Sequence, residues 1–173
     1  MSKSQHENEW TGIGEMPADA DFAAALEREH SASERAVHGD SAELKQLCTH
    51  TDDISVAGRG GGYECGWADV SARYDWVAGQ YLDGHLEHRL LASGHSGDLG
   101  YSFELVTGRV RFVGAETSVP VALRETHVWR READGWKLLH RHADQLLPKV
   151  ERLADIDQSW LDDEQAQPGL GTG

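Results

Sequence analysis

The sequence predicts an α+β domain whose helices lie on one side of a curved antiparallel sheet. Two observations predict this class. Residues 19–81 contain three segments with the apolar spacing of helices, and residues 85–144 form long segments in which apolar and polar side chains alternate. Because helices and long strands are segregated along the chain, the order favours α+β architecture. The 173 residues suit one domain with tails and allow a substantial hydrophobic core.

Three helices are predicted in the first half of the chain. The first covers 19–38, and a glycine follows it. Ser41 can cap a short second helix. The third runs over about 68–81, and its apolar stripe includes Tyr74, with Trp76 beside it. Aromatic residues at this spacing belong to a core or form the wall of a cavity, so Tyr74 and Trp76 are candidate ligand-binding residues.

The long strands are predicted to form an antiparallel meander of four, one of which is the run at 99–112. A short strand pair, at 53–57 and 63–65, precedes the third helix. The glycine run at 58–62 lacks the lysine and the Ser/Thr of a phosphate-binding loop, so we interpret it as a flexible hairpin tip. Gly108, inside a long strand, is expected to mark a bulge or a bend.

The composition limits the partners and the location that we expect. The net charge is −14, with acidic residues gathered toward both ends of the chain, which disfavours nucleic acid and anionic membranes. Two cysteines in a chain of this length are typical of a reducing cytoplasm, and no apolar run is long enough to span a membrane. We therefore expect a cytoplasmic protein. We expect a disordered or loosely docked arm over 1–18, a folded domain over 19–147, and an acidic extension over 148–173. The extension is expected to form a short helix and then a disordered tail.

A predicted hairpin at 123–144 concentrates residues that can do chemistry. Asp134-Gly135 is a dipeptide favoured in two-residue turns, and with this turn Trp129 pairs with His140 and His127 pairs with His142. This register predicts that one face of the sheet carries Glu125, His127, Trp129, His140, His142 and Asp144. A one-residue slip would exchange the faces of a strand. His88 is expected at the surface, and Arg141 on an exposed or interface face.

Two segments of the chain carry a family resemblance. They are RETHVWRREADGWKLLHRHAD, at 124–144, and GWADVSARYDW, at 66–76. They resemble the nuclear transport factor 2-like superfamily, in its SnoaL-like or ketosteroid-isomerase-like branch. The phrase from Glu125 to Trp129 is also similar to the association domain of calcium/calmodulin-dependent kinases. The resemblance covers about 22–147. It implies a cone in which helices and a curved sheet enclose a pocket, and a homodimer formed through the open sheet face.

The resemblance implies several different activities, among them isomerases, polyketide cyclases, dehydratases, epoxide hydrolases and binding modules. A fold does not determine a function. Our first hypothesis is a protein that binds a small organic ligand in the cone pocket without established catalysis and without a cofactor. Its candidate ligand-binding residues are Tyr74, Trp76, Arg124, Glu125, Trp129 and His140.

Two alternatives remain open. In the first, the protein is an isomerase, cyclase or dehydratase that transfers a proton: His142 or Asp144 is the base, and His127 or Tyr74 polarises a substrate oxygen. The resemblance to polyketide cyclases places His127 and Asp144 near equivalent positions. In the second, a cupin-like metal-binding activity uses His127, His140 and His142 with Glu125 or Asp144 as ligands.

Overall fold

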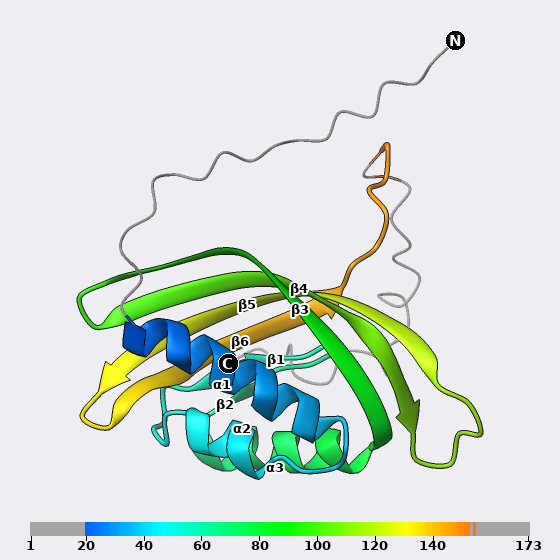
Figure 1. The fold of residues 1–173 in the computed structure, drawn as a ribbon, viewed down its shortest axis with the longest axis horizontal. Coiled ribbons are helices and arrows are strands. Elements are labelled where there is room, and N and C mark those ends of the chain that lie inside the picture. The colour runs from blue at the N-terminus through cyan, green and yellow to red at the C-terminus, as the bar shows by residue number, and fades with distance from the viewer. Residues whose placement is uncertain (1–19, 153, 155–173) are drawn as a thin grey trace, which may run out of the picture.

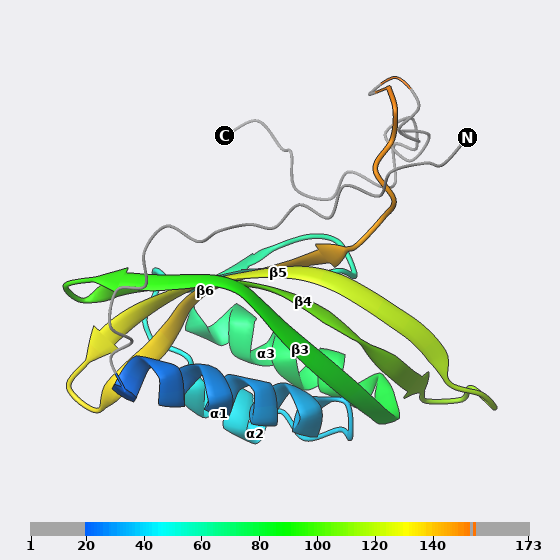
Figure 2. The same ribbon diagram turned by 45° about the horizontal axis from the view of Figure 1, so that its top comes forward.

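The computed structural model describes residues 20–152 and 154, and it confirms the predicted α+β class. The sheet has six strands in the order β2-β1-β6-β5-β4-β3. The elements are α1 (Ala20–Ala36), α2 (Ala42–Leu47), β1 (Ser55–Ala57), β2 (Glu64–Cys65), α3 (Trp67–Gly79), β3 (Tyr81–Ser96), β4 (Leu99–Phe112), β5 (Val119–Glu132) and β6 (Gly135–Gln145). The long strands curve over the helices, which cover one side of the sheet (Figures 1 and 2).

The helices form where the sequence predicts them, because each presents an apolar stripe to the sheet. On α1 the buried positions include Phe22, Leu26 and Glu29, which share one helix face. The helix ends before Gly39, whose φ of 89° is the conformation that glycine adopts most readily. Ser41 makes no side-chain capping bond to α2, and its hydroxyl donates to Asp75 of α3 instead.

The short strands extend the sheet beyond its long meander. β1 pairs antiparallel with β2, as the sequence predicts, and parallel with β6. The longer strands pair antiparallel in sequence order. Their alternation buries one face and leaves the other exposed: along β5, Leu123 and Glu125 are buried, whereas Arg124 and Thr126 are exposed. The inner, concave face therefore holds the candidate site.

Gly108 has a role different from the expected bulge. The register shifts between β3 and β4 lie at Tyr81/Asp83 and at Leu90/Ala92, whereas Gly108 pairs regularly with Leu86. A Cβ atom at Gly108 would lie 2.0 Å from the carbonyl oxygen of His85. Glycine is required here because the backbones of β3 and β4 approach closely.

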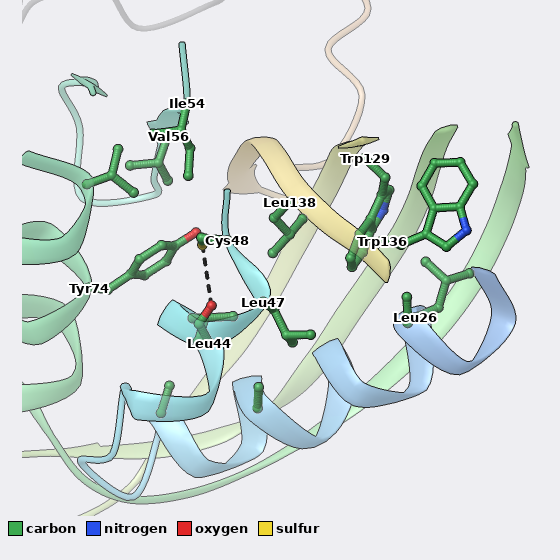
Figure 3. Close-up of a cluster of buried hydrophobic side chains, with 14 of the residues drawn as sticks. Leu26, Leu44, Leu47, Cys48, Ile54, Val56, Tyr74, Trp129, Trp136 and Leu138 are labelled. Carbon is green, nitrogen blue, oxygen red and sulfur yellow. Dashed lines mark hydrogen bonds between the residues drawn. The ribbon is translucent and has the colours of Figure 1, made fainter. Parts of the chain in front are cut away.

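One end of the concave face is filled by a hydrophobic core (Figure 3). Trp129 and Trp136 lie side by side there, and the ring of Phe22 from α1 contacts both, at 6.0 Å and 4.8 Å between centroids. Leu138 and Leu47 continue the same cluster. This packing fixes α1 across the sheet.

Two sequence predictions fall mainly on residues that the structure leaves undescribed. They are the arm at 1–18 and most of the extension at 148–173, including the greater part of its short helix. Among the described residues, no helix is both long enough and apolar enough to span a membrane.

Candidate functional site

The predicted register of the β5–β6 hairpin is wrong. Glu132 pairs with Gly135, so the two-residue turn is Ala133-Asp134 and Gly135 follows it with a φ of 120°. Trp129 then pairs with Leu138. A bulge follows, because Val128 pairs with His140 and leaves Leu139 as an extra residue in β6.

The bulge reverses the orientation of the rest of β6. His127 pairs with Arg141, and Thr126 pairs with His142. Residues that pair directly share a face of the sheet. Arg141 therefore lies on the inner face, while His142 is exposed on the outer face. We predicted that six residues share one face of the sheet. The prediction is correct for Glu125, His127 and Trp129, and it is wrong for His140, His142 and Asp144.

The outer residues have partners away from the cavity. His140 Nδ1 lies 2.8 Å from Ser55 Oγ, and burial, aided by the nearby imidazoles, lowers the pKa of His140. Arg124 makes a two-pronged, exposed ion pair with Asp144, with nitrogen–oxygen distances of 3.0 Å and 2.6 Å. These positions do not support His142 or Asp144 as a catalytic base. They also do not support a metal site that combines His127 with His140 and His142.

Two carboxylates face each other on the inner face. Glu104 of β4 pairs directly with Glu125 of β5, and both are almost completely buried. Like charges placed directly opposite repel, so nearby positive charge must compensate them. His127, which is fully buried, lies between the two: its Nδ1 is 3.4 Å from Glu104 Oε1 and its Nε2 is 3.4 Å from Glu125 Oε2.

Arg141 supplies the second positive charge. Its NH2 donates to Glu125 Oε1 at 2.6 Å. Burial favours the neutral form of Glu125, but the charges of Arg141 and His127 outweigh burial and lower the pKa of Glu125 to about 2. Burial likewise opposes a charge on His127, but the carboxylates of Glu29, Glu104 and Glu125 raise the pKa of His127 to about 9.

Two histidines from other elements also contact the carboxylate of Glu104. His30 Nε2 of α1 lies 2.8 Å from Glu104 Oε2, and His88 Nδ1 of β3 lies 3.3 Å from the same oxygen. The rings of His30 and His88 stack at 4.2 Å between centroids. Burial favours the neutral form of Glu104, but the neighbouring His127 and the hydrogen bonds from His30 and His88 hold its pKa well below the usual value.

A cavity of about 230 Å³ opens beside this cluster. Most of its wall is apolar, supplied by α1, α3 and the inner face of the sheet. Its buried end carries polar side chains, including His88, Glu125 and Arg141, and it extends to the exposed residues Trp76 and Gln80. The Nε2 of His88 and the Nε of Arg141 are buried and have no hydrogen-bond partner among the described residues.

The predicted ligand-binding residues divide between cavity and core. Tyr74 lines the cavity, and burial raises the pKa of its hydroxyl well above the ordinary value. Trp76 lines it too but is 53% exposed, and Arg73 lies over its ring at 4.5 Å. Trp129 lies in the core instead, where its Nε1 donates to Ser102 Oγ. Glu125 lines the cavity, whereas Arg124 and His140 are outside its lining.

Sequence reasoning missed four residues of the site. The expectations of a surface position for His88 and an exposed or interface position for Arg141 are wrong, since both side chains line the cavity and are 7% and 18% exposed. Glu29 follows Leu26 by three residues on the buried stripe of α1, and Glu104 alternates with buried Ser102 and Val106 on β4. An acid on the apolar stripe of a helix was the available signal for Glu29. Glu104 carried no such signal, because it alternates with the apolar residues Leu99, Tyr101 and Phe103, which lie on the other face of β4.

Solved structures match this chain in fold at low sequence identity. A ketosteroid isomerase-like protein from Erwinia carotovora atroseptica is 20% identical with a TM-score of 0.65, and the match covers 75% of this chain and 96% of that one. A nuclear transport factor 2 (NTF2-like) superfamily protein from Salmonella enterica is 17% identical with a TM-score of 0.65, covering 80% and 96%. A type 2 hexachlorocyclohexane dehydrochlorinase is 17% identical with a TM-score of 0.62, covering 78% and 95%. No protein-family model and no curated protein matches the sequence.

Proposed function

We propose that this chain, which has the nuclear transport factor 2-like fold, binds a small organic molecule in the cavity on the concave side of its sheet. The observation that carries the proposal is an apolar cavity with a few polar groups gathered at its buried end, which is the usual composition of a small-molecule site. The structural neighbours include proteins named for isomerase-like and dehydrochlorinase activity, and these names are compatible with a small organic ligand.

The polar end favours a ligand that carries a hydrogen-bond acceptor, such as a carbonyl or hydroxyl oxygen. The Nε of Arg141 has a hydrogen to donate and is unpartnered among the described groups. His88 Nε2 is also unpartnered among them, and because Nδ1 donates to Glu104, the Nε2 of a neutral imidazole accepts, which suits a ligand hydroxyl. Leaving a buried polar group unpaired costs free energy, so a ligand oxygen that accepts from Arg141 Nε, or a ligand hydroxyl that donates to His88 Nε2, would be stabilised.

The proton-transfer alternative loses its proposed base, because His142 and Asp144 lie on the outer face. His127 is adjacent to the cavity lining but is itself enclosed by Glu104 and Glu125. Ligand binding is therefore the function that the geometry supports best.

Filling the cavity tests this proposal. Val77 of α3 lines the cavity, and the change Val77→Trp adds an indole to it. We expect the variant to bind the amphipathic dye anilinonaphthalene sulfonate at least about tenfold more weakly than the unmutated protein, because burial of the dye's apolar rings drives binding. Isothermal titration calorimetry measures the affinity.

The matched control is Ala72→Trp, on an exposed position of the same helix. It is expected to bind the dye like the unmutated protein. Equal binding by all three proteins would place the dye elsewhere, and no saturable binding by the unmutated protein would contradict the cavity proposal. Native mass spectrometry of the protein as purified can then identify a retained ligand.

We also propose that a second copy of this chain covers the exposed face of the sheet. Leu99 and Tyr101 of β4 point to that face and are 53% and 48% exposed. Apolar side chains exposed on a sheet surface are typical of contact surfaces.

Light scattering should give the mass of two chains for the unmutated protein. Replacing Tyr101 by Glu should shift the measured mass toward that of one chain. A single-chain mass for the unmutated protein would contradict the dimer.

A further inference from the structure

Four side chains with metal-ligating atoms converge behind the cavity. Glu29 and His30 are neighbours on α1, His88 comes from β3 and Glu104 from β4. One donor atom from each lies within 4.8 Å of the others. Residues from three elements are therefore brought to one point by the fold.

The burial of this cluster distinguishes it from a patch of surface acids. Glu29 and Glu104 are each 1% exposed. His88 is nearly buried as well, whereas His30 reaches solvent and leaves a route into the cluster. Two carboxylates so deep in a protein need compensating charge.

Each carboxylate has one oxygen held by a neighbour, which leaves its other oxygen available as a ligand. Ser33 Oγ donates to Glu29 Oε1 at 2.7 Å, while Glu29 Oε2 is buried without a partner among the described residues. His127 lies at 3.4 Å from Glu104 Oε1, while Glu104 Oε2 faces His30 and His88. Metal sites are commonly built this way, with outer partners that orient each ligating carboxylate.

We propose that Glu29, His30, His88 and Glu104 bind one divalent transition-metal ion. Two imidazoles and two carboxylates are a ligand set that suits zinc, and also manganese, iron and cobalt. The ion would lie between α1 and the sheet. Because His88 also lines the cavity, the ion would be next to the ligand proposed above, but its binding does not depend on that ligand.

A second group of donors lies beside the first and shares Glu29 with it. It consists of Glu29, Glu125 and His127. It offers three residues instead of four, and Glu125 is already paired with Arg141 at 2.6 Å. The guanidinium charge of Arg141 would repel a cation placed there. The four-residue cluster is therefore the better metal site.

The experiment titrates the full chain, stripped of metal by a chelator, with Co²⁺ and with Zn²⁺ in a calorimeter. We expect one ion per chain. The change His30→Gln removes a ligand from the four-residue cluster and leaves the second group intact, and it should weaken the affinity by at least about tenfold. His85→Gln is the control, because His85 is exposed and pairs with Glu34 outside the cluster.

Three results would overturn the proposal. The first is no saturable binding by the unmutated chain, and the second is unchanged binding by His30→Gln. The third is loss of binding in His127→Gln while His30→Gln retains it.

The visible spectrum of the cobalt-loaded, unmutated chain supplies a measurement that requires no variant. An intense absorption band is expected from a four-coordinate ion, and the weak band of an octahedral ion would contradict this ligand set.

Discussion

Replacing Arg141 by methionine is expected to lower the free energy of unfolding by about 3–5 kcal/mol. The change removes the 2.6 Å ion pair with Glu125 and leaves that buried carboxylate facing Glu104 with less compensating charge. An uncompensated charge in a protein interior is far more costly than the loss of the contact itself. Urea unfolding monitored by circular dichroism measures the difference.

A surface arginine provides the matched control. Arg124 pairs with Asp144 in an ion pair whose side chains are 50% and 44% exposed. Because solvent screens such pairs, Arg124→Met should change the stability by less than about 1 kcal/mol.

The double variant Arg141→Met/Glu125→Gln separates charge from packing. With the carboxylate neutralised, most of the lost stability should return. If the double variant is as unstable as Arg141→Met, or if Arg141→Met matches Arg124→Met, the charge-compensation argument is wrong.

Alanine at Gly108 is expected to destabilise the fold by more than about 3 kcal/mol, beyond the 1–3 kcal/mol typical of overpacking. The added Cβ would meet the carbonyl oxygen of His85 at 2.0 Å and the backbone of Leu86 at 3.1 Å. Backbone atoms cannot rotate away as a side chain does, so β3 and β4 must separate where they pair. Thermal unfolding followed by calorimetry measures the loss.

Gly79→Ala is the comparison for this variant. Gly79 is exposed at the end of α3, and an added Cβ there has no atom within 4 Å. Alanine favours helix over glycine, so this variant should be as stable as the unmutated protein or slightly more stable. A Gly108→Ala protein that unfolds at the same temperature as Gly79→Ala would show that the two strands separate at little cost.

The fold class and the element order were predictable because they depend on periodicity. The bounds of β4, for example, match the predicted long strand, since its alternation is sustained from Leu99 to Phe112. Helix α1 was equally clear from its stripe. Such patterns are local, so they identify an element without its partners. They do not always identify the buried face, since on β4 the apolar Leu99 and Tyr101 are exposed and Ser102 and Glu104 are buried.

The contents of the site were less predictable because they depend on pairing. The residues of β5 were assigned to the correct face, since the alternation through Glu125, His127 and Trp129 is unbroken. Those of β6 were not, because a bulge at Leu139 leaves no mark in the residue types. The sequence also does not show that Glu29 and His30 of α1 lie close to Glu104 of β4, because that contact depends on how the helix packs on the sheet.

The bulge gives the ion pair between Arg141 and Glu125 a role beyond energy. Strand β6 has two ways to lie against β5, and a bulge-free alignment would bury His140 and His142 and turn Arg141 outward. Of the two, only the observed alignment places the guanidinium of Arg141 against Glu125. The buried pair therefore favours one register of the hairpin over the other, in addition to its contribution to the free energy of folding.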